Sequence, residues 1–228
     1  MTKLMIKERE VVVPGDIIAE GMNYLPSTGT YRQGQHIMAS RMGIMRLEGK
    51  VVKIIPLAGK YLPRRGDVII GKIIDVNIMA WRVETNSAYS AMLSVKDGTS
   101  SFVRRGADLT RIYAIGDYII TKIINVTSQK LVDLTMRGPG LKKLDGGRII
   151  KVTPTKVPRI IGKEGSMVVM IKSLTNCDIM VGQNGIVWIK GEPKDEILAV
   201  ETIRKIEDES HVSGLTDKIK NFLESAKR

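Results

Sequence analysis

Residues that usually perform catalysis are scarce in this sequence. Its 228 residues include one cysteine, Cys177, and two histidines, His36 and His211. A lone thiol cannot close an intramolecular disulfide and is typical of a reducing compartment, so we expect a cytoplasmic protein in which Cys177 is a buried structural thiol. The histidines fall in different expected domains, and neither pairs readily with the cysteine as the base of a nucleophile.

Motifs for metal or cofactor chemistry are also missing. The sequence has no Cys-x-x-Cys pair, no Walker-type phosphate loop and no closely spaced carboxylates suited to two-metal phosphodiester chemistry. The acidic run at 207–209 falls at the expected end of a helix, and we interpret it as solvated charge. We therefore expect no metal, no cofactor and no intrinsic catalysis, with an enzyme of unrecognised site as an alternative.

Long apolar runs are absent as well. No run approaches the roughly 18 residues of a membrane span, and the N-terminal segment carries charged residues too early for a signal peptide. Hydrophobic residues make up 43% of the chain, which is typical of a folded protein. We expect one large domain or two to three small ones, and no membrane partner.

Positive charge is what the sequence has in excess. The formal net charge is +12 and the pI is about 9.8, which favours a polyanionic partner. Residues 141–172 hold 8 Lys/Arg against 2 Asp/Glu, whereas residues 173–228 hold 8 against 10. The charge therefore gathers around a Gly-Lys-Glu-Gly sequence at 162–165, and this coincidence points to nucleic acid.

Two short helices are expected on either side of the Gly-Lys-Glu-Gly sequence. Ile160, Ile161, Val168 and Ile171 have spacings that place them on the inner face of these helices. Glycine at both ends of the turn leaves room for a phosphodiester backbone, and the second helix directs its positive N-terminal end there. The pattern resembles the KH RNA-binding motif, whose loop clamps about four nucleotides. A purely structural helix-turn-helix is the alternative.

The KH resemblance implies RNA contacts at the turn and just before it. The candidate residues are Arg159, Gly162, Lys163, Glu164 and Gly165. Glu164 departs from what such a loop should carry, because its negative charge repels phosphate. We therefore expect Lys163, Arg159 and the helix amides to make the main contacts.

The elements around the turn follow the order β-α-α-β-β-α of a type I KH domain. Strands are expected at 148–152, 177–182 and 186–190, with an Asn-Gly hairpin turn between the last two, and a long helix begins at Pro193. Residues 211–228 have apolar residues at helical spacing. We expect this tail to pack on the domain or on a partner.

A strand pattern repeats in the middle of the chain. The stretch 66–76 recurs at 116–126, each time as a Gly-Asp turn and a β-branched strand with one lysine in its middle, Lys72 or Lys122. Three more strands complete a set of five, which predicts an OB-fold barrel. They are expected at 79–84, 88–95 and 131–135.

This middle unit resembles the OB-type RNA-binding domain that is named after a small-subunit ribosomal protein. Such domains offer aromatic rings on strands two and three for base stacking. Here only Trp81, Tyr89 and Phe102 are candidates, and each also suits a core, so we expect weak stacking and electrostatic guidance of RNA. The cations expected to provide it are Lys72, Arg104, Arg105, Arg111 and Lys122. A solvated loop is the alternative for the arginines.

The first 63 residues predict a small all-β unit of hairpins. Short apolar strands are separated by glycines, with a polar loop at 22–34. No catalytic motif occurs in this unit, so we interpret it as a docking surface. The expected multidomain fold is an all-β domain at 1–63, a five-stranded OB-fold barrel at 64–138, a glycine-rich connector at 139–147 and an α+β type I KH domain with a helical tail at 148–228.

Taken over nearly its full length, the chain resembles the RNA-binding cap subunit of the archaeal exosome, of the ribosomal RNA-processing protein four type. The resemblance rests on short stretches in all three expected domains. They are Val12–Asp16, Arg105–Leu109, Arg137–Leu141, Lys156–Met167 and Val181–Trp188. The last stretch is distinctive of this family rather than of KH domains in general.

The resemblance implies a phosphorolytic 3′→5′ RNA-degrading machine in which this chain binds and delivers RNA but does no chemistry. With two further copies, it would form a ring on a hexamer of ribonuclease-PH-like subunits. The N-terminal domain would dock on the hexamer, the OB domains would line the entry pore and the KH domains would lie outward. A free-standing RNA chaperone or translational regulator is the alternative that the same OB and KH modules allow.

Overall fold

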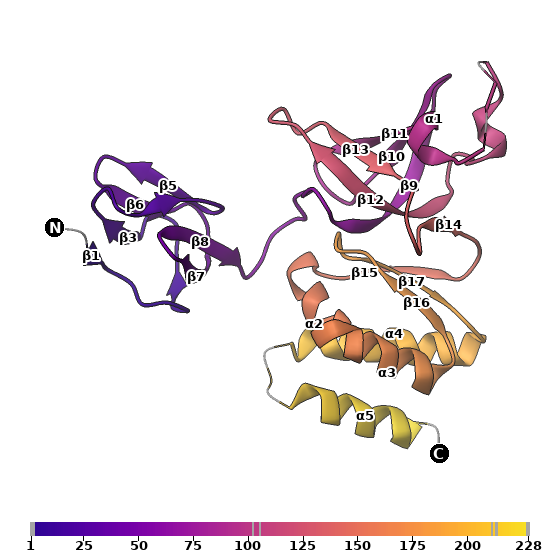
Figure 1. The fold of residues 1–228 in the computed structure, drawn as a ribbon. Helices are drawn as coiled ribbons and strands as arrows, with labels where there is room; N and C mark the ends of the chain where they lie inside the picture. Colours follow the sequence, from indigo (N-terminus) through magenta and orange to yellow (C-terminus); the bar gives the residue numbers. More distant parts are fainter. Residues whose placement is uncertain (1–2, 102, 105, 211, 213, 227–228) are drawn as a thin grey trace. The chain divides into compact units, whose positions relative to one another are not determined.

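The computed structural model describes residues 3–101, 103–104, 106–210, 212 and 214–226. The chain forms two compact units, Met1–Gly59 and Lys60–Arg228 (Figure 1). Tyr61 packs in the core of the second unit and its hydroxyl donates to Asp67 at 2.6 Å, so that unit begins before the boundary expected at residue 63. In the described part of the chain, no helix is long and apolar enough to cross a membrane.

The N-terminal unit consists of two four-stranded sheets. One has the order β1-β3-β6-β5 and the other the order β2-β7-β8-β4. Their inner faces share one core because alternate residues of a strand point inward, as Val52 and Ile54 of β8 do. The strands are β1 (Lys3–Leu4), β2 (Val11–Val12), β3 (Ile17–Glu20), β4 (Leu25–Pro26), β5 (Thr30–Gln33), β6 (His36–Ala39), β7 (Gly43–Glu48) and β8 (Val51–Pro56).

The expectation of a loop at 22–34 is wrong in part, because strands β4 and β5 lie within it. β5 pairs with β6 along its whole length, from Thr30 opposite Ala39 to Gln33 opposite His36. None of its residues is fully buried, so no hydrophobic alternation marks the strand in the sequence. Gly34, with a φ of +59°, allows the tight turn between the two strands.

The second unit begins with a closed five-stranded barrel, which confirms the predicted OB fold. The strand order is β13-β11-β10-β9-β12, and β13 pairs again with β12 to close the barrel. The β11–β13 pair is parallel and the other pairs are antiparallel. The two repeated strands are neighbours, with Ile70 of β9 opposite Ile120 of β12. The bounds are β9 (Val68–Val76), β10 (Ala80–Glu84), β11 (Ser90–Ser94), β12 (Tyr118–Val126) and β13 (Val132–Thr135).

The stretch expected as a glycine-rich connector at 139–147 contains one more strand of this sheet. β14 (Lys142–Leu144) pairs antiparallel with β12, and Leu144 lies buried opposite Tyr118. This stretch is therefore part of the packed structure. Between β11 and β12 lie helix α1 (Val95–Gly98) and the 3₁₀ turn η1 (Leu109–Arg111).

The rest of the second unit has the predicted β-α-α-β-β-α order of a KH domain. Helices cover one face of an antiparallel sheet with the order β15-β17-β16 (Figure 1). The tail helix α5 packs into the same core through Leu215, Ile219 and Leu223. Cys177 is buried, as predicted, and its thiol donates to the Thr175 carbonyl. The elements are β15 (Arg148–Lys151), η2 (Pro154–Lys156), α2 (Val157–Ile161), η3 (Lys163–Gly165), α3 (Ser166–Thr175), β16 (Asp178–Val181), β17 (Ile186–Lys190), α4 (Pro193–Asp208) and α5 (Leu215–Ala226).

The buried faces of the KH helices differ slightly from those predicted. Ile160 and Ile171 are fully buried as expected, but Met167 is buried beside Val168, which is only half-buried. In α4, the apolar side chain of Ile197 is 49% exposed. The helical period instead turns another set of residues inward. These are Ala199, Thr202, Ile203 and Ile206.

The KH sheet also packs against the barrel, within the second unit. Side chains alternate along its strands: Ile150 and Val181 belong to the core under the helices, whereas Ile149 and Met180 belong to a second cluster on the barrel side. That cluster also contains Ile70, Ile120, Leu144, Ile186 and Trp188. Both faces of the KH sheet are therefore covered, one by helices and the other by the barrel.

Candidate nucleic-acid interface

The Gly-Lys-Glu-Gly turn joins α2 to α3 with a backbone that needs its glycines. The φ angle is +77° at Gly162 and +83° at Gly165, a region that disfavours side chains. A Cβ at Gly162 would lie 2.7 Å from the Met167 backbone nitrogen, whereas one at Gly165 would meet nothing within 4 Å. Glu164 between them has a φ of +53°. The first glycine therefore packs the turn against α3, and the second keeps its outer side open.

The charged side chains of this turn are available to a ligand. Arg159, Lys163 and Glu164 are all exposed. Helix α3 begins at Ser166, directly after the turn, so the positive end of its dipole lies beside these side chains. The Ser166 amide already donates to the Lys163 carbonyl, and the Gly165 amide donates to the Gly162 carbonyl at 3.3 Å. Two cations and the positive end of the helix dipole suit a phosphate group, with Glu164 as the one opposing charge.

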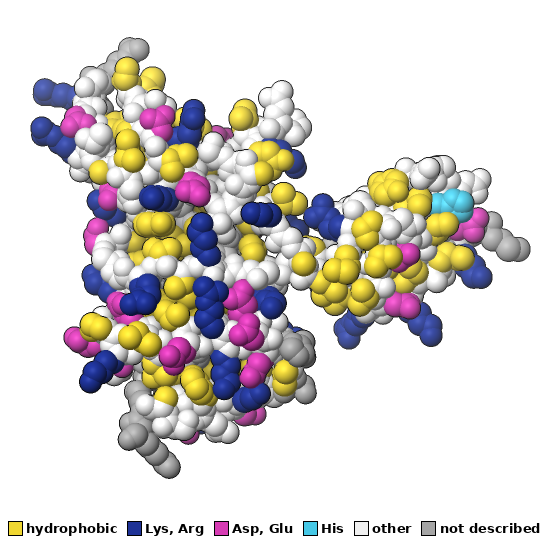
Figure 2. Space-filling view, turned by 180° about the vertical axis from the view of Figure 1, so that it is seen from behind, with side chains coloured by type: hydrophobic (Ala, Val, Ile, Leu, Met, Phe, Trp, Pro, Cys, Tyr) yellow, Lys and Arg dark blue, Asp and Glu magenta, His cyan; other side chains and the backbone are white. Residues whose placement is uncertain are grey.

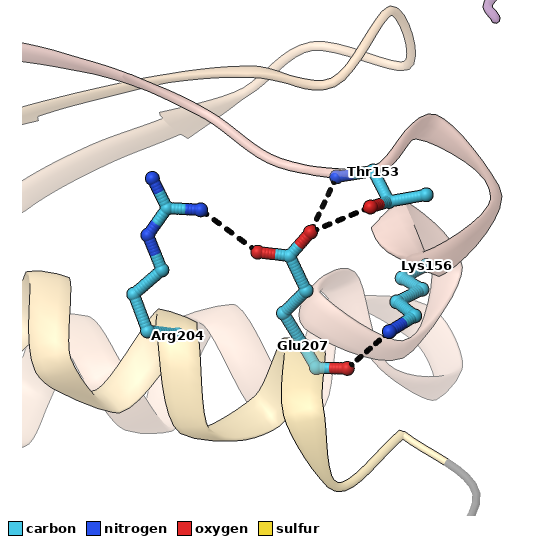
Figure 3. A network of polar contacts seen from close by, with 4 residues as sticks. All are labelled: Thr153, Lys156, Arg204 and Glu207. Carbon is cyan, nitrogen blue, oxygen red and sulfur yellow. Dashed lines mark hydrogen bonds and ion pairs between the residues drawn. The ribbon is translucent and has the colours of Figure 1, made fainter.

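A polar network holds the segment that leads into α2 (Figure 3). The amide and the hydroxyl of Thr153 both donate to one carboxylate oxygen of Glu207 at 2.7 Å, and Arg204 donates to the other at 2.9 Å. Lys156 donates to the Glu207 carbonyl at 2.8 Å. The interpretation of Glu207 as solvated charge is wrong, because its side chain is only 12% exposed.

The protonation of Glu207 follows from these contacts. Burial alone would raise the pKa of its carboxyl, but the hydrogen bonds from Thr153 and the Arg204 guanidinium outweigh burial and hold the pKa below its usual range. The ionised carboxylate ties the start of α2 to the end of α4. The network therefore positions the turn, and the Lys156 ammonium serves the protein rather than a ligand.

Trp81, one of the candidates for base stacking on the barrel, is a core residue and cannot stack on a base. Its side chain is fully buried, and its indole N–H lies 3.3 Å from the Leu109 carbonyl and 3.1 Å from the Tyr113 carbonyl. The Tyr113 ring stands edge-on to it at 5.1 Å between ring centres. Tyr89 is half-buried in the loop before β11, and Phe102 lies outside the described residues. Weak stacking stays a prediction.

The structure does not bring the two predicted strand lysines together. Lys72 and Lys122 project from the adjacent strands β9 and β12, but their partners across the pair, Tyr118 and Val68, place them at opposite ends of it. Lys72 is half-buried, with its Nζ 5.9 Å from the centre of the Tyr118 ring, whereas Lys122 is exposed. Of the two, Lys122 is the more accessible cation.

The predicted arginines lie in the segment between α1 and β12. Arg104 is exposed, and the Arg111 side chain is 86% exposed with its Nε 3.6 Å from Asp108. Hydrogen bonds from Thr110, helped by Arg111, hold the pKa of Asp108 below its usual range, so this acid offsets part of the local positive charge. Arg105 lies outside the described residues. Of the predicted barrel cations that the structure describes, two therefore lie on strands and two lie in this segment.

Sequence reasoning missed Arg82, a cation on β10, which is the second strand of the barrel. Arg82 is exposed on the outer face of β10, opposite Met92 of β11 and Asp75 of β9. The signal was present in the alternation of β10, because Trp81 and Val83 are buried and the residue between them must point outward. A guanidinium beside the apolar Met92 gives this face a contact for both phosphate and base.

A second feature that sequence reasoning missed joins the KH domain to the barrel. The turn between β16 and β17 reaches β9, where the Gln183 amide donates to the Val68 carbonyl at 2.9 Å and its Oε1 accepts from the Val68 amide at 2.8 Å. The side chain of the buried Asn184 makes two hydrogen bonds to the backbone of Ile70. Its Oδ1 accepts from the Ile70 amide at 3.3 Å, and its Nδ2 donates to the Ile70 carbonyl at 2.8 Å. Its Nδ2 also donates to the Thr85 carbonyl at 2.9 Å.

These contacts continue a hydrogen-bond ladder that β10 leaves unfinished. β10 ends opposite Lys72, so the backbone groups of Val68 and Ile70 on that edge need other partners. The fit is tight, because a Cβ at Gly182 would lie 2.4 Å from the Asn184 Oδ1. The segment expected only as a hairpin turn is therefore a contact between domains.

Three family models match consecutive parts of the chain. Residues 9–58 match a model described as "Exosome RNA binding protein RRP4 N-terminal domain", residues 60–105 match "RRP4, S1 domain" and residues 147–195 match "KH domain". The S1 match falls on the barrel and the KH match on the α+β part. The models therefore follow the order of the parts seen in the structure.

Curated archaeal proteins named exosome complex component Rrp4 are similar over nearly the whole chain. The protein from Methanothermus fervidus is 43% identical over 221 residues, which cover 96% of this chain and 97% of that protein. The protein from Thermococcus kodakarensis is 43% identical over 232 residues, which cover 100% and 90%. A crystal structure of a protein described as an RNA-binding protein of the exosome complex is 37% identical, with a TM-score of 0.67, and covers 75% of this chain and 98% of that one.

Proposed function

Since the chain belongs to the Rrp4 family of exosome complex components, we propose that it is the RNA-binding cap subunit that feeds RNA into the pore of a 3′→5′ exoribonuclease core. The observation that carries this proposal is the 43% identity over nearly the whole chain, with matches to the N-terminal, S1 and KH models in one order. The chain binds and delivers RNA in the cytoplasm without catalysis. A ribonuclease-PH-like hexamer cleaves the RNA by phosphorolysis.

Binding to RNA is mainly electrostatic in this proposal. The net charge of +12 favours a polyanion, and Lys and Arg side chains are spread over the barrel and KH parts of the face seen in Figure 2. On the barrel, Arg104, Arg105 and Arg111 guide the strand from the loop, and Lys72, Lys122 and Arg82 do so from the strands. Contacts of this kind to phosphate carry little sequence information, which suits a subunit that delivers many RNAs.

In the KH domain, the RNA backbone approaches the open side of the Gly-Lys-Glu-Gly turn. The positive end of the α3 dipole attracts phosphate there, and the exposed Lys163 and Arg159 side chains bind it. The exposed carboxylate of Glu164 opposes this contact. The grip of the KH domain is therefore weaker than that of a turn without an acid.

The N-terminal unit docks on the hexamer through the outer face of its β2-β7-β8-β4 sheet. Val11, Ile44 and Ile55 are neighbours across three adjacent strands of that sheet. Val11 is 56% and Ile55 42% exposed, although Val12 and Ile54 beside them are buried in the core. Hydrophobic side chains gather on the face of this unit seen in Figure 2. An exposed apolar row of this kind supports an interaction with another protein.

Assembly with the hexamer tests the proposal. The purified chain and the ribonuclease-PH-like hexamer are mixed and sized by light scattering, and RNA decay is then followed with and without phosphate. We expect three chains per hexamer and faster or more processive decay than with the hexamer alone. Ile55→Glu should weaken association, whereas the matched Ile55→Val should not.

Other outcomes would point elsewhere. If the parent chain binds RNA but does not associate with the hexamer, a free-standing RNA-binding protein is the better description. If the purified chain degrades RNA alone and loses that activity when one acid is replaced, the chain is an enzyme.

A further inference from the structure

A pocket of about 430 Å³ lies on the barrel, apart from the cations described above. One wall is the end of α1 with the residues that follow, 97–100, and the other is the segment 137–142, which leads from β13 into β14. Tyr113 and Met136 also line the pocket. Its volume falls within the roughly 300–1,000 Å³ range of small-molecule sites.

Hydrogen bonds hold the first wall in place before any ligand arrives. The Tyr113 hydroxyl donates to the Gly98 carbonyl at 3.0 Å, and the Met136 amide donates to the Asp97 carbonyl at 2.8 Å. A Cβ at Gly98 would lie 2.6 Å from the Trp81 ring, so the end of α1 packs directly on the barrel core. A preformed pocket loses little free energy to ordering when a ligand binds.

The charges around the pocket favour an anion. Lys142 is exposed, with its Nζ 6.0 Å from the centre of the Trp188 ring, whereas its neighbour Lys143 forms an ion pair with Asp117 at 2.6 Å. The acid of the lining, Asp97, accepts a hydrogen bond of 2.8 Å from the Ser94 hydroxyl. Arg137 adds a second cation, and its Nη2 donates to the Lys96 carbonyl at 2.6 Å, which fixes the guanidinium at the wall.

The other lining atoms suit a flat, partly apolar group. Met136 and Leu141 supply aliphatic surface, and Tyr113 adds an aromatic ring whose hydroxyl is already satisfied. Cationic groups next to apolar surface match the two ends of a nucleotide, a phosphate and a base. We propose that this pocket binds one nucleotide of a single-stranded RNA, with the phosphate at Lys142 and the base against Met136 and Leu141.

This inference rests on the proposed RNA-binding function and adds a subsite to it. The 137–141 segment is one of the stretches on which the family resemblance rests, but the sequence analysis predicted no RNA contact for it. Ser100 at the other wall begins the loop that carries Arg104. A strand guided by that loop therefore meets the pocket on the same barrel.

Two measurements on the full chain test the pocket. In the first, a single-stranded RNA with 5-iodouridine is photo-cross-linked to the unmodified chain, and the cross-link should map to Tyr113 or Met136. In the second, anisotropy of fluorescein-labelled RNA gives the affinity of variants. Lys142→Ala should weaken binding about fivefold in 0.1 M salt and lower the slope of log affinity against log salt by about 0.7, the value for one phosphate contact of a single strand.

Matched variants separate the pocket from general charge effects. Ser100 lines the pocket and is exposed, so Ser100→Glu should weaken binding more than Ser100→Gln, because the two new side chains have the same size and only Glu carries a negative charge. Lys50→Ala in the N-terminal unit removes the same charge as Lys142→Ala and should bind RNA like the parent. Because Lys142 and Ser100 are both exposed, these changes should leave the melting temperature unchanged.

The pocket would be excluded if the cross-links map elsewhere and both Lys142→Ala and Ser100→Glu bind like the parent. If Arg104→Ala still weakens binding in that case, the proposed function stands without this subsite. A parent chain that binds no RNA at all would overturn both.

Discussion

Replacing Asn184 by alanine should weaken the junction between the KH domain and the barrel. The Asn184 side chain is fully buried, and it makes three hydrogen bonds to the backbone of Ile70 and Thr85, at 3.3, 2.8 and 2.9 Å. Alanine would leave one amide and two carbonyls of the barrel without these partners. The contact from the Asn86 side chain to the Asn184 carbonyl, at 2.8 Å, would remain because it uses the main chain.

The size of the effect follows from the cost of unpaired buried groups. Each costs about 1–3 kcal/mol, so three of them would cost roughly 3–9 kcal/mol if the site stayed dry. We expect the lower limit, about 3 kcal/mol, because water can enter the space that the side chain vacates. In a domain of this size 1 kcal/mol corresponds to about 2–4 °C, so the melting temperature should fall by about 6–12 °C.

Thermal unfolding by circular dichroism and hydrogen exchange at the Ile70 amide measure the two consequences. Gln183→Ala is the matched control, since Gln183 is exposed and its side chain accepts one hydrogen bond, so the loss should stay below about 1.5 kcal/mol. Asn184→Asp keeps the shape but places an oxygen opposite two carbonyls, and it should be at least as damaging at neutral pH. A shift below about 2 °C for Asn184→Ala, with unchanged protection of the Ile70 amide, would refute the reasoning.

Three further predictions concern the charged groups of the second unit. Glu164→Gln should strengthen RNA binding about two- to fivefold at low salt, because repulsion between unit charges 4–8 Å apart in water costs roughly 0.5–1 kcal/mol; anisotropy should show the gain disappearing near 1 M salt, and an equal gain at high salt would contradict the electrostatic cause. Arg104→Ala combined with Arg111→Ala should lower the salt slope of RNA binding by about 1.4, the value for two phosphate contacts, and an unchanged slope would remove these residues from the RNA path. Glu207 has a folded-state pKa below the ordinary value of 4.5, so its contribution to stability is present above that value and is lost as the pH falls through the folded-state pKa. Denaturant melts of the parent and of Glu207→Gln should therefore differ at pH 7 and converge as the pH falls below the folded-state pKa, whereas a constant difference would argue against the ionised network.

Hydrophobic periodicity decided which elements were predictable. β9 and β12 are long and β-branched, and their repeated Gly-Asp starts predicted the two paired strands of the barrel. β5 and β14 were missed because Thr30–Gln33 and Lys142–Leu144 are short and mostly polar. Their strand conformation depends on a neighbouring strand that supplies hydrogen bonds, and a local pattern does not contain that information.

The candidate site also contains residues that could be predicted from the sequence and residues that could not. The Gly-Lys-Glu-Gly turn was predictable because its glycines, cations and flanking helices are contiguous in the chain. Asn184 was not, because its partner Ile70 lies 114 residues away. Trp81 shows a third case, in which the residue type suits both a core and a stacking surface, and only burial distinguishes them.

The junction formed by Asn184 also bears on how the two RNA-binding parts act together. The KH sheet is covered by helices on one face and by the barrel on the other, and we expect RNA to bind at the helical side, where Arg159 and Lys163 are exposed. A fixed junction holds that side at a constant distance from the barrel cations. A strand long enough to reach both then gains from a high effective concentration at the second site. Loosening the junction should therefore weaken binding of long RNA more than binding of RNA that fits one site.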